Sequence, residues 1–207
     1  MREIDPMTTP RADSWQAFHR APMPMVTIFQ TWDITELVSF QATSGYKLNM
    51  LLCWCIGRGA QQTKEFYLLP VGDKLLAYEK LGISVIVANR AGGIHSCDIP
   101  FCEDLNQFDQ DYRRLTRQVA ERGQDHTLED HMMVGTSSLV AYELDGVANF
   151  YSGIYNNPFL IWGKYRREGE RVKLPVSFQF HHVQMDGLEA CAFLQRVQQE
   201  LSALPRI

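Results

Sequence analysis

Two adjacent histidines near the end of the chain are the residues best placed to do chemistry. His181 and His182 follow an alternating strand pattern and precede Asp186 and Gly187. A neutral imidazole held in one tautomer can take a proton from a hydroxyl or thiol with its free nitrogen. The end of a rigid strand can hold a ring in this way, so the pattern is compatible with a general base.

Alternation in the preceding strand gives the two histidines different surroundings. Apolar side chains at every second position predict one buried face of the strand. These positions are Val172, Leu174, Val176, Phe178 and Phe180. If the alternation continues, His182 lies on the side of Phe178 and Phe180, and His181 lies on the other side. Parity thus separates the two residues without assigning a role to either.

Asp186 stands four residues after His182 and allows two interpretations. Its carboxylate either caps the helix that follows or forms an ion pair that fixes the turn. Gly187 permits a tight reversal of the chain. Because His-x-x-x-Asp is a short pattern, ordinary strand-end histidines beside a helix cap stay open as the alternative to a catalytic site.

The elements that must position this turn predict one α+β domain over residues 1–207. We expect a large mixed β-sheet with helices packed on it. The expected strands are residues 25–32, 65–70, 74–79, 83–88, 132–144, 149–155, 159–165 and 171–180. The expected helices are residues 47–62, 105–122 and 188–204, and one that ends near residue 44.

Three further segments complete this prediction. The helix that ends near residue 44 is expected to start at a capping box, with Asp33 as N-cap and Glu36 reaching back. Residues 15–20 form either a short helix or an irregular arm. Residues 89–103 contain two glycines and a proline without periodicity, so they are expected to form a long loop.

Composition excludes several classes of function. The formal net charge is −4 and no dense Lys/Arg run occurs, which argues against nucleic-acid binding. The longest apolar run, residues 51–56, is too short to span a bilayer. The first six residues contain no hydrophobic signal core, so a cytoplasmic location is the default expectation.

No metal site is predicted from the cysteines and histidines. The sequence has five cysteines, an odd number, and no Cys-x-x-Cys pair. Cys97 and Cys102 lie near His95, but a zinc site there would lack a fourth ligand and the usual spacing. We therefore expect structural or incidental thiols.

Residues 164–187 closely resemble the C-terminal region of the chloramphenicol acetyltransferases. That family ends a strand in His-His-x-x-x-Asp-Gly and closes with a helix, as this chain does at residues 181–187. The segments 147–150 and 33–35 extend the resemblance, and the helices at 47–62 and 105–122 fall in the expected order. We expect a divergent member of this family with a two-layer α/β sandwich.

The resemblance also implies a mechanism. His182 would be the general base that deprotonates an acceptor hydroxyl, which then attacks acetyl-CoA directly in a ternary complex. Asp186 would form a supporting ion pair, for which Arg20 lies near the position of the partner arginine in some members. The family further implies a homotrimer with active sites between subunits. Lys164 and Tyr165, within the matching block, are candidates for CoA binding.

Other positions depart from the family pattern. A gapless comparison puts Gly135 where the family has an oxyanion-stabilising serine, and Thr136 or Ser137 could substitute only with a shift. Ile161 replaces a family threonine, and Ile94 lies in a region that replaces an aromatic wall of the acceptor pocket. These changes argue against a pocket shaped for chloramphenicol.

Two hypotheses of function follow from the intact turn and the altered pocket. The first is a CoA-dependent O-acetyltransferase whose acceptor is unidentified. The second is a family member that has lost efficient catalysis and serves as a trimeric binding or assembly factor for another protein. The first requires acetyl-CoA binding and the second does not.

Overall fold

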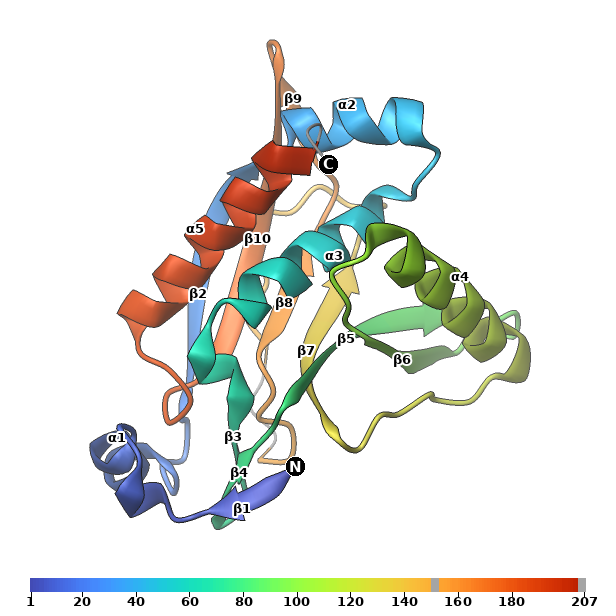
Figure 1. Ribbon diagram of the computed structural model, residues 1–207. Coiled ribbons are helices and arrows are strands. Elements are labelled where there is room, and N and C mark those ends of the chain that lie inside the picture. Colours follow the sequence, from blue (N-terminus) through green and yellow to red (C-terminus); the bar gives the residue numbers. More distant parts are fainter. Residues whose placement is uncertain (150–152, 205–207) are drawn as a thin grey trace.

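A large mixed β-sheet forms one layer of the computed structural model, which describes residues 1–149 and 153–204 (Figure 1). Its strands are β2 (Met25–Asp33), β5 (Lys80–Ala88), β6 (Ile94–Pro100), β7 (His131–Ser138), β8 (Phe159–Trp162), β9 (Arg166–Glu168) and β10 (Arg171–His181). The order is β2-β10-β8-β7-β5-β6, and β9 also pairs with β10. β7 runs parallel to β5 and β8, whereas the other neighbours are antiparallel.

Helices cover one face of this sheet, which confirms the predicted two-layer α/β architecture (Figure 1). They are α2 (Thr35–Ser44), α3 (Leu48–Gln61), α4 (Leu105–Arg122) and α5 (Gly187–Ala203). α3 packs between α4 and α5 and is buried on all sides from Met50 to Gly57. A Cβ on Gly59 would stand 2.7 Å from a methyl group of Val197, so the glycine lets α3 and α5 approach closely. None of the described helices combines the length and the apolar character needed to cross a bilayer.

β10 is the central strand for the candidate site, and both of its faces are buried from Leu174 to His181. The predicted face, with Val172, Leu174, Val176, Phe178 and Phe180, is buried, and the opposite face is buried as well. On the helix side, Phe178 packs against Phe66 and Phe193. On the other side, the chain at residues 147–149 crosses the strand, because Val147 N–H donates to Ser177 and Gln179 donates to the carbonyl of Asn149.

A second, smaller sheet supports the end of β10. Its strands are β1 (Arg2–Ile4), β3 (Leu68–Val71) and β4 (Lys74–Ala77), in the order β1-β4-β3. Two 3₁₀ turns, η1 (Pro6–Thr8) and η2 (Lys64–Tyr67), flank it, and α1 (Ala12–Phe18) follows η1. Trp15 of α1, Leu75 of β4 and Val183 form a separate buried cluster. The N-terminal segment therefore packs directly against the turn after β10.

The prediction of one long loop at residues 89–103 was wrong, because β6 (Ile94–Pro100) lies in the middle of this segment. β6 pairs with β5 over its full length and forms an edge of the large sheet. The reversal is confined to residues 89–93, where the Asn89 side chain accepts hydrogen bonds from the N–H groups of Ala91 and Gly93. An edge strand needs no continuous apolar pattern and tolerates Pro100 at its end, which hid this strand from periodicity.

Three other strands end earlier than predicted. β4 stops at Ala77 rather than residue 79. β7 stops at Ser138 rather than residue 144, since a turn closed by the Tyr142 N–H and the Leu139 carbonyl follows it. β8 stops at Trp162 rather than residue 165. The predicted strand at 149–155 lies partly outside the described residues, at 150–152, and residues 153–155 are not in a strand.

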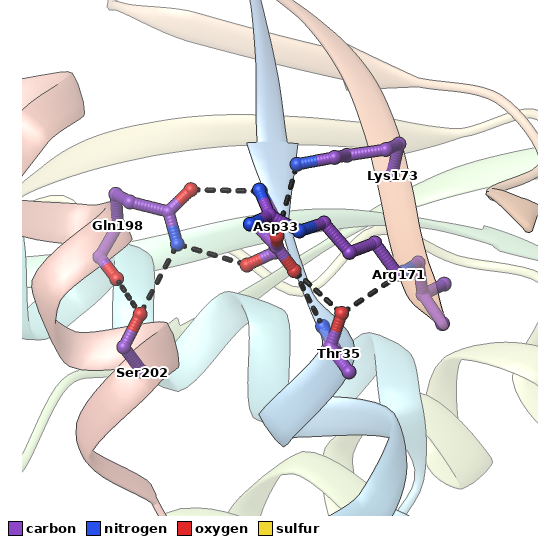
Figure 2. A network of polar contacts seen from close by, with 7 residues as sticks. Asp33, Thr35, Arg171, Lys173, Gln198 and Ser202 are labelled. Carbon is purple, nitrogen blue, oxygen red and sulfur yellow. Dashed lines mark hydrogen bonds and ion pairs between the residues drawn. The ribbon is translucent and has the colours of Figure 1, made fainter. Parts of the chain in front are cut away.

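Asp33 forms a polar network at the far end of β10 instead of the predicted capping box (Figure 2). α2 begins at Thr35 with Ile34 as its N-cap, so Asp33 lies one residue too early for that role. One carboxylate oxygen accepts from the Thr35 hydroxyl at 2.6 Å, and the other contacts the Lys173 ammonium at 2.9 Å. The Gln198 amide bonds both the N–H and the carbonyl of Asp33 and so joins α5 to β2.

Asp33→Asn is expected to lower the unfolding free energy and to remove part of its acid dependence. The hydrogen bond from Thr35 and the Lys173 ion pair lower the folded-state pKa of Asp33 to about 2 from 3.8. Its stabilising contribution is therefore complete above about pH 4 and is lost as the pH falls through about 2. Urea unfolding at several pH values should show the difference between variant and wild type shrinking over that window.

The matched control for this experiment is Asp73→Asn, because Asp73 is an exposed carboxylate paired with Arg20. Loss of such a surface pair is expected to cost less than about 0.5 kcal/mol. A difference for Asp33→Asn that stays constant from pH 5 to pH 2 would contradict the assignment.

Candidate active site

The histidine turn links the end of β10 to the start of α5. β10 ends at His181, and the next four residues reverse the chain. The His182 N–H donates to the Pro24 carbonyl at 2.8 Å, and the Gln184 N–H donates to the His181 carbonyl at 2.8 Å. α5 then begins at Gly187 with Asp186 as N-cap, whose N–H donates to the Glu189 carboxylate. Asp186 thus takes the position of a helix cap.

His181 is built into the protein interior. Its residue is 1% exposed, and its Nδ1 accepts a hydrogen bond from the Val183 N–H at 3.1 Å. Burial lowers the pKa of His181 to about 4. The ring is therefore neutral at physiological pH, and its Nδ1 holds the backbone of the turn.

His182 has a different environment, because β10 ends at His181 and His182 lies in the turn that follows. Its side chain is 31% exposed, and its ring stacks on Phe18 of α1 with centroids 4.1 Å apart. Nδ1 is buried and lies 3.2 Å from an Asp186 carboxylate oxygen, although the contact is not aligned as a hydrogen bond. This leaves Nε2 as the nitrogen available for proton transfer. A stacked, partly exposed imidazole beside a carboxylate is suited to accepting a proton.

Arg11, rather than Arg20, is the ion-pair partner of Asp186, so the prediction for Arg20 was wrong. Two guanidinium nitrogens of Arg11 each bond one carboxylate oxygen at 2.8 Å. The same group donates to the carbonyls of His182 and Val183, also at 2.8 Å. These contacts lower the pKa of Asp186, chiefly through the hydrogen bond from Arg11, so the carboxylate is ionised.

Arg20 lies beyond the end of α1 and pairs with Asp73 on the surface, where its side chain is 75% exposed. Arg11 instead precedes α1 and has an 11% exposed side chain. Arg11 and Phe18 are seven residues apart, which is two helical turns. That spacing puts the two side chains on one side of α1, but it does not point to Asp186, which is 175 residues away from Arg11.

The strand β7 separates the oxyanion candidates by parity. Thr136 faces the helices, is 1% exposed, and donates its hydroxyl to the Ser84 carbonyl. Thr136 was therefore a wrong candidate, because its hydroxyl is committed inside the core. Ser137 lies on the opposite face of β7, is partly exposed, and pairs in register with Ile161 of β8.

Gly135 shares the face of Ser137 and has an observable packing role. A Cβ at this position would stand 2.2 Å from the Phe159 ring and 3.1 Å from the Tyr155 hydroxyl. Both side chains therefore occupy the space that a serine would need. Glycine at position 135 therefore allows Phe159 and Tyr155 to pack against β7.

The remaining candidates lie away from the histidine turn. Ile94 begins β6 and is 71% exposed, whereas Ile161 is buried in β8. Lys164 is exposed after β8, and the Tyr165 ring packs on the core with the Arg167 guanidinium 5.9 Å from its centroid. Among the described residues, no hydrogen bond, ion pair or ring contact joins this group to His182.

The cysteines and the other histidines form no second reactive centre in the described part of the chain. Burial raises the pKa of Cys53 and of Cys97 to about 12, so both stay protonated thiols. All five cysteines are free of disulfides. Residues 1–149 and 153–204 contain no grouping of three or more His, Cys, Asp or Glu side chains that could hold a metal ion.

Comparison with known proteins agrees with this arrangement. The sequence model described as chloramphenicol acetyltransferase matches residues 2–198. The chain belongs to the chloramphenicol acetyltransferase family. It is 27% identical over 188 residues to chloramphenicol acetyltransferase 3 of Escherichia coli, covering 87% of each chain. Its identity with chloramphenicol acetyltransferase 2 of the same organism is 25% over 171 residues, covering 80% of each.

Solved structures show the same fold. A chloramphenicol acetyltransferase superposes with a TM-score of 0.81 at 16% identity, covering 97% of this chain and all of the other. The dihydrolipoamide acetyltransferase of Azotobacter vinelandii superposes with a TM-score of 0.69 at 21% identity, covering 94% and 86%. Membership in the chloramphenicol acetyltransferase family supports acetyltransferase chemistry with acetyl-CoA as co-substrate at the level of the reaction class.

Arg11→Ala is expected to lower the unfolding free energy by about 1–3 kcal/mol, because two carbonyls and an ionised carboxylate lose their donors. Arg11→Lys keeps the positive charge but loses the planar guanidinium that bonds both carboxylate oxygens. Its unfolding free energy should lie between those of the wild type and Arg11→Ala. Chemical denaturation measures the loss, and nitrogen NMR of the His182 ring reports whether its tautomer changes.

Arg20→Ala is the matched control, because Arg20 is a nearby but exposed arginine with one weak ion pair. We expect its cost to stay below about 0.5 kcal/mol. Equal losses for the two alanine variants would mean that the Arg11 fork does not support the turn.

Proposed function

We propose that the protein transfers an acetyl group from acetyl-CoA to the hydroxyl of a small molecule, with His182 as general base. The observation that carries the proposal is the placement of His182, a partly exposed ring stacked on Phe18 with its buried Nδ1 beside Asp186. Asp186 itself is held by Arg11. Such support fixes the orientation of a base before substrate binds.

The proposed reaction proceeds without a covalent acyl-enzyme. The acceptor hydroxyl gives its proton to Nε2 of His182 while its oxygen attacks the thioester carbon of acetyl-CoA. The tetrahedral intermediate then expels the CoA sulfur, and the imidazolium returns the proton to that sulfur. Asp186 stabilises the imidazolium electrostatically during this step, because its pKa is lowered and it stays ionised.

Ser137 is the described hydroxyl of β7 that suits the developing oxyanion, since Thr136 is directed into the core. Among residues 1–149 and 153–204, no hydrogen bond, ion pair or ring contact joins Ser137 to His182, although both belong to the proposed reaction. A site between subunits would bring them together. We therefore propose that the single-domain chain assembles as a homotrimer.

Exposed apolar side chains support an assembled state. Phe29 on β2, Ile86 on β5 and Val140, Tyr142 and Ile154 beyond β7 are between 41% and 87% exposed. Large apolar side chains with this much exposure are expected on a surface that another chain covers. The strands β2, β5 and β7 belong to the large sheet, and the helices cover one face of this sheet (Figure 1).

CoA carries several phosphates, so its site should offer unpaired cations. Lys164 is exposed next to Tyr165, which provides an aromatic surface for an adenine ring. The other candidate position is a basic cleft between β5 and α4, where Lys47 and Arg117 are among the lining residues. We propose that the phosphates of acetyl-CoA bind one of these two positions.

The test of the chemistry is CoA release from acetyl-CoA with a panel of hydroxyl acceptors. We expect His182→Ala to lower kcat by about 10²–10⁴-fold, the usual contribution of a general base. Ser137→Ala should lower kcat by about 10–10³-fold if its hydroxyl meets the oxyanion. Thr136→Val removes a neighbouring hydroxyl that faces the core, and its kcat should be close to wild type.

A mixing experiment tests where the site lies. Chains carrying His182→Ala and chains carrying Ser137→Ala are each impaired when expressed alone. When they are co-expressed, a site between subunits can take His182 from one chain and Ser137 from another, so activity should recover in part. A site within one chain predicts no recovery, because neither kind of chain carries both residues. Sedimentation equilibrium of the wild-type protein checks the trimer directly.

The altered face of β7 favours one alternative, a trimeric binding or assembly factor without efficient catalysis. Phe159 and Tyr155 fill the space at Gly135 where a family serine would stand. Calorimetry with acetyl-CoA separates the two functions, since only the enzyme requires binding. Undiminished turnover in His182→Ala would exclude the proposed mechanism, and absence of any stoichiometric protein partner in affinity purification would argue against the alternative.

A further inference from the structure

A cavity of about 370 Å³ lies on the face of the large sheet opposite the helices, over β5, β6 and β7. This volume lies within the range of small-molecule sites. None of its described lining residues belongs to the histidine turn. Its described lining residues are Ser84, Ile86, Ser96, Asp98, Thr127, Met133, Tyr155, Asn157 and Phe159.

Strand register explains why these side chains converge. Ser84 is paired with Asp98, and Ile86 with Ser96, so all four lie on one face of the β5–β6 ladder. β7 adds Met133 to the same face. Residues with the opposite parity, such as Cys97, pack in the core beneath the helices.

Aromatic residues form one wall because Gly135 has no side chain. The Phe159 ring lies where a Cβ on Gly135 would stand. The Tyr155 and Phe159 rings pack edge to face, with their centroids 6.2 Å apart. Ile86 and Met133 extend this apolar surface. A ligand that fits must therefore present an apolar body to this wall.

Asp98 is the ionisable acid among the described lining residues, and its residue is 8% exposed. One carboxylate oxygen accepts a hydrogen bond from the Leu128 N–H at 3.0 Å. The other oxygen makes no hydrogen bond or ion pair with residues 1–149 or 153–204. Tyr155 and Asp98 both line the cavity, and the pKa of Tyr155 is raised, first by burial and then by the charge of Asp98.

A carboxylate that is nine-tenths buried in largely apolar surroundings is costly unless a partner compensates its charge. A bare metal ion suits the cavity poorly, because hard cations take about six or more oxygen ligands and this wall is mainly apolar. An ammonium group needs few acceptors and is also favoured by aromatic faces. The hydroxyls of Ser84 and Ser96 line the cavity with Asp98. They can accept hydrogen bonds from the ammonium protons that do not face the carboxylate.

We propose that this cavity binds a small molecule that carries a protonated amine on an apolar body, with the ammonium paired to the free oxygen of Asp98. The apolar body lies against Met133 and Phe159. Where the ligand is taken to be the acetyl acceptor, the proposal rests on the proposed function and names its class, an amino alcohol. The binding itself requires no catalysis.

The test uses two compounds of nearly the same size, 2-amino-1-phenylethanol and 1-phenylethane-1,2-diol. The first is protonated at neutral pH and the second is neutral. Ligand-observed NMR titration of the full-length protein without acetyl-CoA measures both dissociation constants. We expect the amine to bind about tenfold more tightly, the preference that one charge-assisted hydrogen bond supplies.

Asp98→Asn should abolish that preference, since the amide keeps an acceptor for the Leu128 N–H but carries no charge. Asp125→Asn is the matched control, because Asp125 lies in the same segment, is exposed, and accepts from the Ser96 N–H without lining the cavity. It should retain the preference for the amine. Equal binding of the two compounds to wild type, or a preference that persists in Asp98→Asn, would overturn the proposal.

Carbon NMR of the Asp98 carboxylate in the wild-type protein provides a measurement that needs no variant. Its resonance should shift with the amine and stay in place with the diol, and the reverse result would also overturn the proposal. CoA release with both compounds separates this inference from the proposed function. Binding without turnover would contradict the function alone, whereas equal turnover of both compounds would contradict the amine site alone.

Discussion

The contact on which the candidate site depends is the fork between Arg11 and Asp186. One planar guanidinium bonds both carboxylate oxygens and also the carbonyls of His182 and Val183. A lysine would supply the charge but could not reach four acceptors in fixed directions. The fork therefore determines at once how β10 ends, where α5 begins and how the ring of His182 is oriented.

Strand parity is the second constraint, because it divides the sheet into two surfaces with different chemistry. The surface beneath the helices is apolar and takes up even a hydroxyl such as Thr136 in an internal hydrogen bond. The opposite surface keeps Ser137, Gly135 and the acid Asp98. A shift of one residue in β7 would turn Thr136 to the opposite surface and Ser137 toward the helices, so the register decides which of the two hydroxyls is accessible.

Sequence reasoning was accurate where the signal is local. The helix at 105–122 was predicted to the residue, since its apolar face repeats at three and four and Gly123 ends it. The turn at 181–187 was identified by its motif. Prediction from the sequence failed for β6, because a strand at the edge of a sheet does not need an apolar pattern. The arginine was also missed, because its partner Asp186 is 175 residues away and no local pattern reports such a pair.

That separation has a consequence for how the protein forms. Arg11 and Asp186 are 175 residues apart in the sequence, so their contact closes a very long loop that contains every strand of the large sheet. Loop closure of this length is unfavourable until most of the sheet has assembled. The helices and the β5–β6 hairpin can fold from local contacts, whereas the imidazole is oriented only when both ends meet. The candidate site should thus be among the last parts of the fold to form.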